Sequence, residues 1–248
     1  MFPIRDHNPS RRIPFVTYAL LISNIGIFLL YQGIASDPTA LSAFYYDWGM
    51  IPRSITTGHR LDTLFTSMFL HGGWMHLAGN MLFLWIFGDN VEDKLGHGGF
   101  IVFYLVCGLL ASGGQIVADP TSWVPNIGAS GAIAGLLGGY LLLFPRAKVD
   151  VLLILIVYFR VFAIPAWVML GLWLGFQIVN GIIADTSSGG IAYWAHSAGF
   201  VAGFILMFPV WVRLGGPVFW ANTDVHPANP DATYPFVKSR IPKVRKNR

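Results

Sequence analysis

The sequence contains few charged residues. Only 11% of its 248 residues are Asp, Glu, Lys or Arg, whereas ordinary soluble domains contain roughly a quarter. Hydrophobic residues make up 54% of the chain, and its mean hydropathy is +0.58. This composition excludes an ordinary soluble domain and indicates a protein that resides in a lipid bilayer.

Cysteine and cleavage signals are also scarce. Cys107 is the single cysteine, which excludes an intrachain disulfide framework and leaves the redox compartment open. The first apolar run is not followed by a small-residue cleavage site of the A-x-A kind, so we expect it to remain as an uncleaved helix. There is no internal repeat of the type that marks many transporters.

Long apolar runs are what the sequence has instead. A helix needs about 20 residues to cross the hydrocarbon core, and six runs approach or reach this length, which predicts an all-α bundle of six transmembrane helices. A seventh run, Val151–Phe159, is short and is followed by Arg160, so we expect it at the membrane interface or at the start of the fifth span. The six predicted spans are Phe15–Tyr31, Leu64–Phe87, Phe100–Ala118, Ile127–Phe144, Phe162–Ala184 and Ile191–Val212.

The basic residues predict the orientation. If the N-terminus is cytoplasmic, only Arg53 and Arg60 of the 16 Lys and Arg residues lie in outside segments, as the positive-inside rule requires. The expected organisation is a cytoplasmic segment 1–14, a six-helix domain 15–212 with a first outside loop at about 32–63, and a disordered, cytoplasmic basic tail 213–248. The net charge of +4 therefore requires no nucleic-acid partner.

Polar residues inside spans are costly and are candidates for function. In "HGGWMHLAGNMLF", His76 and Asn80 are four residues apart and share one helix face. His71 precedes Gly72 and Gly73, which favours a position at the mouth of the helix. The sixth span contains His196, and every acidic residue falls in a predicted loop or tail.

Small residues predict which helices meet. Ser130 stands in "NIGASGAIAGLLGGY", at the outer end of a small-residue face, and His196 lies beside the outer end of a second such face. Small-xxx-small faces allow two helix backbones to approach closely, so packing these faces together would place the hydroxyl beside the imidazole, as a serine nucleophile needs. The two faces are Gly131, Gly135 and Gly139 in the fourth span, and Ala195, Gly199 and Gly203 in the sixth.

Other interpretations of these residues exist. A lone serine among glycines is more often a packing residue, and we interpret Ser67, Ser112 and Ser197 in this way. Two intramembrane histidines are also compatible with a bis-His haem protein, with His76 and His196 as axial ligands. That alternative leaves the G-A-S-G segment unexplained.

Three motifs resemble those of one family. "GASG" at 128–131, "HLAGN" at 76–80 and "AHSAGFVAG" at 195–203 are similar to the G-x-S-G, H-x-x-x-N and A-H-x-x-G-x-x-x-G signatures of the rhomboid intramembrane serine proteases. They occur in three separate predicted helices in the family's order. The segment around Ser130 does not match the nucleophile elbow of soluble hydrolases, because the motif G-x-S-x-G would need glycine in place of Ala132.

The resemblance implies a catalytic dyad without cofactor or metal. Ser130 would be the nucleophile and His196 the general base and acid. His76, Asn80 and the backbone N–H of Ser130 would stabilise the oxyanion. The residues expected to support the site are Gly128, Gly131, His71, Gly199 and Gly203.

The same resemblance implies partners and location. The substrates would be transmembrane segments of other membrane proteins, cleaved within the bilayer, and the short basic N-terminus favours a bacterial plasma (cell inner) membrane. A catalytically inactive relative that binds transmembrane clients is the alternative.

Two positions depart from the family pattern, and one loop has no counterpart in the motifs. His59–Arg60 stands where many relatives have a Trp-Arg pair. Ala134 stands where some relatives have a tyrosine that stacks on the catalytic histidine. We expect Tyr193 or Trp194 to take the place of that tyrosine. The segment Asp185–Gly190 is expected to be a flexible cap.

Overall fold

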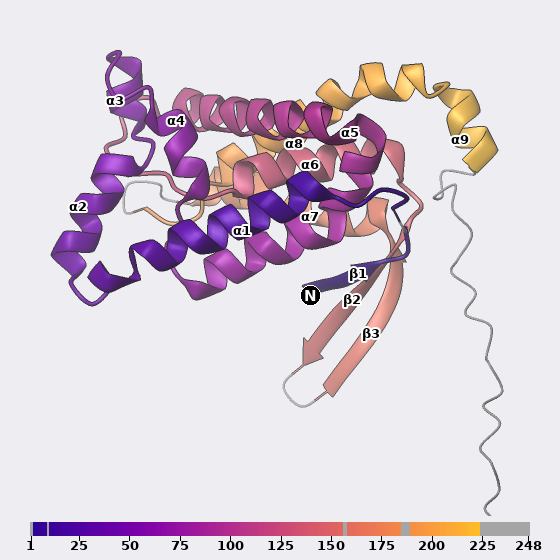
Figure 1. Cartoon of the computed structure of the whole chain (residues 1–248), viewed down its shortest axis with the longest axis horizontal. Coiled ribbons are helices and arrows are strands. Elements are labelled where there is room, and N and C mark those ends of the chain that lie inside the picture. Colours follow the sequence, from indigo (N-terminus) through magenta and orange to yellow (C-terminus); the bar gives the residue numbers. More distant parts are fainter. Residues whose placement is uncertain (1, 9, 156–157, 185–188, 224–248) are drawn as a thin grey trace, which may run out of the picture.

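The computed structural model describes residues 2–8, 10–155, 158–184 and 189–223, and these are mostly helical (Figure 1). Five long helices pack side by side into one bundle, with short helices at both of its ends. The long helices are α1 (Phe15–Leu30), α5 (Trp74–Ala118), α6 (Ser130–Leu143), α7 (Ala166–Ile183) and α8 (Tyr193–Arg213). The shorter ones are η1 (Gln32–Ile34), α2 (Pro38–Trp48), α3 (Pro52–Thr56), α4 (Thr63–Thr66), η2 (Ser67–Phe69) and α9 (Pro217–Thr223).

Within the described residues, four helical segments are long and apolar enough to cross a membrane: α1 with η1, α5, α7 and α8. Helix α6 is equally apolar but has only 14 residues. From Gly131 to Leu143 nearly all of its residues are buried, and it packs mainly against α5 and α8. A helix that is apolar on all sides belongs in the interior of a bundle, so α6 is the central helix.

Helix α5 contains the second and third predicted spans. Its 45 residues are interrupted at Gly96, where φ is +70° and ψ is 164°, a conformation that glycine adopts without steric cost. The helical segments on the two sides of Gly96 run in opposite directions (Figure 1). The first segment begins at Trp74, ten residues after the predicted start at Leu64, because Gly72 and Gly73 are poor helix formers and separate it from α4 and η2.

A three-stranded antiparallel sheet lies at one end of the bundle, so the all-α expectation is wrong in this part of the chain. The strands β1 (Phe2–Asp6), β2 (Lys148–Leu155) and β3 (Tyr158–Pro165) follow the order β1-β2-β3. The run Val151–Phe159 therefore forms neither an interfacial helix nor the start of α7. It is rich in β-branched and aromatic residues, which favour strands, and the fifth helix begins only at Ala166.

Two carboxylates, of which Glu92 is buried, connect the segments near the sheet. Glu92 accepts hydrogen bonds from the backbone N–H groups of Val16 (2.9 Å) and Thr17 (2.8 Å), so a side chain of α5 caps the start of α1. Asp6 of β1 accepts hydrogen bonds from Tyr140 Oη of α6 (2.9 Å) and from Asn90 Nδ2 of α5 (3.0 Å). The N-terminal strand is thus tied to both helices that meet at this end.

The opposite end carries the loop predicted to be the first outside loop, which contains α2 and α3. Met50 and Asn126 exchange two backbone hydrogen bonds of 3.0 and 2.8 Å, which fixes this loop to the segment before α6. Arg60, at the position of the family's Trp-Arg pair, donates to the Asp47 carbonyl and to the Asp62 carboxylate. The loop is therefore packed against the bundle through local polar contacts.

Two predicted segments fall wholly or partly outside the described residues. Residues 185–188 of the expected cap Asp185–Gly190 are among them, and so are residues 224–248 of the expected tail. The described beginning of that tail is ordered, because it contains α9.

Candidate active site

Ser130 is the first residue of α6. Gly128, two residues earlier, leaves space for the side chains of Ser130 and His76. Gly128 has φ of +132°, and its N–H donates to the Ser67 carbonyl at 2.9 Å. A Cβ atom at Gly128 would lie 2.8 Å from His76 Nε2 and 3.4 Å from Ser130 Oγ. Both the backbone conformation and the lack of a side chain are therefore needed at this position.

The structure brings together the two small-residue faces of α6 and α8. A Cβ atom on Gly199 would collide with the carbonyl oxygen of Gly131, and a Cβ atom on Gly203 would collide with that of Gly135. Backbone thus packs directly on backbone along two turns, as small-xxx-small faces allow. This contact sets the depth of His196 relative to Ser130.

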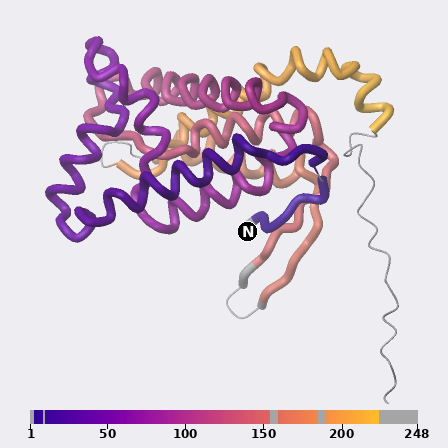
Figure 2. Tube along the Cα trace, in the orientation of Figure 1, coloured from indigo at the N-terminus to yellow at the C-terminus, as the bar shows by residue number. Residues whose placement is uncertain are grey.

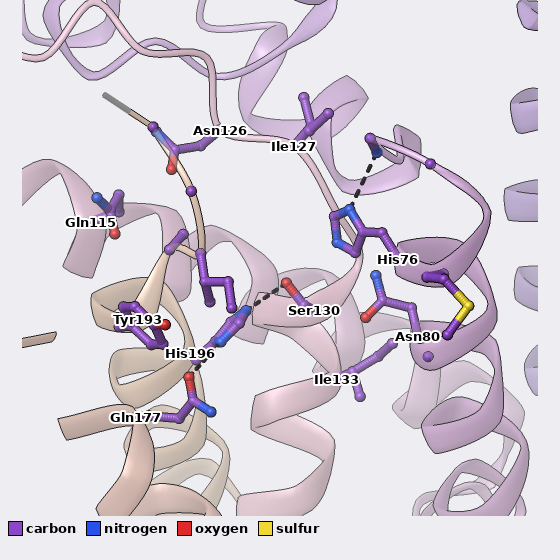
Figure 3. A pocket seen from close by; sticks show the side chains of 18 of the residues that line it. His76, Asn80, Gln115, Asn126, Ile127, Ser130, Ile133, Gln177, Tyr193 and His196 are labelled. Atoms are coloured by element: carbon purple, nitrogen blue, oxygen red, sulfur yellow. Dashed lines mark hydrogen bonds between the residues drawn. The ribbon is translucent and has the colours of Figure 1, made fainter. Parts of the chain in front are cut away.

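Ser130 and His196 form a hydrogen bond (Figure 3). Ser130 Oγ lies 2.7 Å from His196 Nε2. On the other side of the ring, His196 Nδ1 lies 2.9 Å from Oε1 of Gln177. Because an amide oxygen only accepts hydrogen bonds, Nδ1 carries the proton of the neutral ring and Nε2 is free to accept the serine proton.

The indole of Trp173, on α7, faces the same imidazole. The two ring centroids are 5.9 Å apart and the ring planes are inclined by 30°. The expected substitutes for the family's tyrosine lie elsewhere: Tyr193 packs edge-on against Phe176, and Trp194 lies against Gly181. The stacking partner of His196 is therefore Trp173, which the sequence analysis did not select.

A cavity of about 1020 Å³ holds Ser130, His196, His76 and Asn80 together. His76 Nδ1 accepts the N–H of Gly72 at 3.2 Å, so Nε2 carries the ring proton as a donor. Asn80 is 8% exposed, and its Nδ2 has no hydrogen-bond partner among the described residues. Figure 3 shows both side chains on the Ser130 side of the cavity. The arrangement supplies two hydrogen-bond donors to a group bound beside Ser130 Oγ.

His71 precedes α5 and does not line this cavity. It is fully buried, and its ring packs edge-on against His76 at 5.1 Å between centroids. Its carbonyl oxygen accepts hydrogen bonds from Tyr31 Oη (2.8 Å) and Tyr45 Oη (3.1 Å). His71 therefore joins the first outside loop to the start of α5 and contacts the site only through His76.

Two glutamines that were not expected from the sequence line the cavity. Gln177 contacts His196, and Gln115 Oε1 of α5 accepts the backbone N–H of Ala195 at 3.3 Å. Both are buried and both lie inside predicted spans. The signal that could have found them is the one used for His76 and Asn80, namely a polar side chain within an apolar span.

The described residues contain no group of three or more His, Cys, Asp or Glu side chains that could hold a metal ion. The cavity lining contains amides, imidazoles and hydroxyls but no charged side chain among the described residues. Such a site is suited to proton transfer between a hydroxyl and an imidazole and to binding a developing oxyanion.

Comparison with known proteins agrees with this geometry. The Rhomboid domain family matches residues 58–213. The chain is 36% identical over 130 residues to rhomboid protease GluP of Bacillus subtilis, covering 52% of this chain and 24% of that protein. It is 35% identical over 96 residues to the putative rhomboid protease YdcA of Bacillus subtilis, covering 36% and 48%. It is 29% identical over 197 residues to the mitochondrial rhomboid protein 1 of Saccharomyces cerevisiae, covering 77% and 51%.

The chain thus spans between a quarter and about half of the length of these curated relatives. The match to the domain family, however, covers more than half of this chain and includes all three motifs. With its apolar helices, the protein is an integral membrane protein that belongs to the rhomboid family.

Proposed function

We propose that the protein is an intramembrane serine endopeptidase with a Ser130–His196 dyad. The observation that carries this proposal is the 2.7 Å contact between Ser130 Oγ and His196 Nε2 inside a cavity. An isolated serine hydroxyl is a weak nucleophile, and an adjacent base is what activates it.

The reaction follows from the positions of the protons. His196 Nε2 takes the Ser130 proton while Oγ attacks the scissile carbonyl, and the imidazolium then protonates the leaving amine. Water attacks the resulting acyl-enzyme, again with His196 as base, and releases the acid and free Ser130. The tetrahedral oxyanion would accept hydrogen bonds from Asn80 Nδ2, His76 Nε2 and the Ser130 backbone N–H.

The proposed substrates are transmembrane segments of other proteins. Residues of α5 and of α7 both line the cavity. A substrate segment would therefore reach Ser130 from the lipid that surrounds the bundle. Small residues near the cleavage site would favour the reaction, because a helix must unwind locally before its carbonyl can be attacked.

The proposed topology has six spans, with the parts of α5 on either side of Gly96 counted separately, and both termini in the cytoplasm. A bacterial plasma membrane agrees with the similarity to two Bacillus subtilis proteins. The yeast relative is a mitochondrial protein, and fractionation of the cell's membranes tests the proposed location.

The two alternatives fit the site less well. An inactive client-binding protein would not need the Ser130–His196 contact, which is made here at hydrogen-bond distance. A haem protein would need a free nitrogen on His196, whereas both of its ring nitrogens are engaged, one by Ser130 and one by Gln177.

Activity-based labelling in membranes tests the proposal. A fluorophosphonate probe is expected to label the wild-type protein, and Ser130→Ala and His196→Ala are expected to abolish both labelling and cleavage of a transmembrane substrate. Ser197→Ala is the matched control, because its hydroxyl bonds only the Tyr193 carbonyl of its own helix. Normal cleavage by Ser130→Ala, with contaminating proteases excluded, would refute the dyad.

A further inference from the structure

Two side chains of one helix, α7, contact the His196 ring. Gln177 Oε1 lies 2.9 Å from His196 Nδ1, and the Trp173 ring faces the imidazole one turn away. We propose that Gln177 is a positioning residue for the catalytic base: it holds the proton on Nδ1 and directs the Nε2 lone pair at Ser130 Oγ. This inference rests on the proposed protease function.

The burial of Gln177 supports a specific role. It is 5% exposed, whereas its neighbours Phe176 and Ile178 are 57% and 40% exposed. A primary amide on an apolar helix is costly to bury unless it is hydrogen-bonded. Gln177 is turned away from the exposed side of α7, and its oxygen meets the Nδ1 atom of His196.

The chemistry of an amide suits this position. A carboxylate orients the base in soluble serine proteases, but a buried charge without a partner is expensive in a low-dielectric site. The amide oxygen fixes the same tautomer without a net charge. As His196 accepts the Ser130 proton it becomes cationic, and its hydrogen bond to Gln177 strengthens. The contact therefore stabilises the transition state more than the ground state.

The position of α7 then controls the orientation of the base. The buried residues of α7 are only Ala166, Leu170, Gln177 and Gly181, which form one narrow stripe. Any movement of α7 away from α8 would separate Gln177 and Trp173 from His196 together. A displaced α7 would leave Ser130 in place but with an unoriented base.

The test uses the full-length protein and replaces Gln177 by a side chain of similar shape. Gln177→Met has similar volume but lacks the amide acceptor, and it is expected to lower kcat about tenfold with KM within about twofold. Labelling of Ser130 by a small fluorophosphonate should slow by a similar factor. Gln177→Glu, which restores an oxygen acceptor, should recover most of the rate.

Asn180→Met is the matched control. It makes the same chemical change one turn away, where the amide bonds only the Phe176 carbonyl of its own helix, and it should leave both rates unchanged. If Gln177→Met fails to fold, Gln177→Leu, which also lacks the amide acceptor, replaces it and should slow labelling by a similar factor.

The outcomes separate this inference from the proposed function. Wild-type labelling and turnover in Gln177→Met would overturn the positioning role while leaving the protease intact. A loss confined to KM, or to transmembrane substrates with normal labelling, would also overturn it and assign Gln177 to substrate entry. Absence of Ser130-dependent cleavage in the wild-type protein would instead refute the protease function itself.

Discussion

At the scale of single residues, the candidate site uses only neutral side chains. Among the described residues, the cavity lining contains no Asp, Glu, Lys or Arg, so each polar role is assigned to an amide, an imidazole or a hydroxyl. Ser130 Oγ donates to His196 Nε2, Gln177 fixes the tautomer, and Asn80 Nδ2 has no described partner. Uncharged groups avoid the cost of burying ions near the membrane interior. Their catalytic value depends on positions that are fixed before the substrate binds.

Asn80 provides the first prediction. Because its unpartnered N–H group would gain a hydrogen bond only when the oxyanion forms, Asn80→Ala should lower kcat by roughly 10²–10³ and change KM little. Steady-state kinetics on a transmembrane substrate in detergent or liposomes measures both constants. Asn180→Ala, outside the cavity, should behave as wild type. An Asn80→Ala enzyme impaired only in KM would mean that Asn80 binds substrate in its ground state.

At the scale of helices and strands, the contact between α6 and α8 determines the geometry of the site. Along this contact, Gly138, Gly199 and Gly203 lie so close to the backbone of the facing helix that a Cβ atom would not fit. At the far end of α6, Asp6 accepts a hydrogen bond from the Tyr140 hydroxyl, so β1 holds the helix that begins at Ser130 from the opposite end. Both contacts can be altered without touching Ser130 or His196.

Gly203→Ala tests the contact between α6 and α8. The added methyl group would meet the backbone of Gly135, which cannot rotate away, so the helices must separate. We expect a loss of about 1–3 kcal/mol in stability, measured as a lower unfolding temperature in detergent, together with a reduced rate. Gly171→Ala is the control, since no atom lies within 4 Å of its Cβ position. Equal stability of the two variants would show that the contact tolerates side chains.

Asp6 predicts a pH dependence of stability. Burial and the nearby Asp89 carboxylate raise the pKa of Asp6 from 3.8 to about 7. Between about pH 4 and pH 7 the folded state therefore binds more protons than the unfolded state, and stability falls as the pH rises through this window. Asp6→Asn keeps an oxygen that can accept from Tyr140 but does not titrate. It should raise the unfolding temperature by a few degrees at pH 8 and by little at pH 4.

Thermal unfolding of both proteins across this pH range measures the effect. Asp47→Asn, at an exposed position of the outer loop, should leave the wild-type pH profile unchanged. A profile for Asp6→Asn that parallels wild type over the whole range would show that the pKa of Asp6 is the same in the folded and unfolded protein.

The elements also show what the sequence could predict. Length and hydropathy predicted the position of α1 and α8 to within a few residues, because a helix needs no distant partner to satisfy its backbone. The strands were not predicted, because a short apolar run is compatible with both a strand and a buried helix. In addition, β1 pairs with residues about 150 positions away in the sequence. Ser130 and His196 were selected by their motifs. Gln177 has no motif, and its role depends on how α7 is rotated, which hydropathy does not specify.

At the scale of the whole molecule, the two ends differ in structure and chemistry (Figure 2). One end carries α2, α3 and the cavity, and the other carries the N-terminus, the sheet and α9. The basic residues Arg5, Arg146 and Lys148 lie in or beside the sheet. By the positive-inside rule this end should face the cytoplasm, which places the opening toward Ser130 on the outer side.

Cysteine mapping tests this orientation directly. The native Cys107 is fully buried, so it should react slowly and an introduced cysteine can be detected above it. His59→Cys, exposed in the outer loop, should react with a membrane-impermeant maleimide in intact cells. Asn222→Cys, exposed on α9, should react only after the membrane is permeabilised, because a charged reagent cannot cross the hydrocarbon core. Labelling of Asn222→Cys and not His59→Cys in intact cells would invert the topology, and labelling of both would require an even number of spans between them.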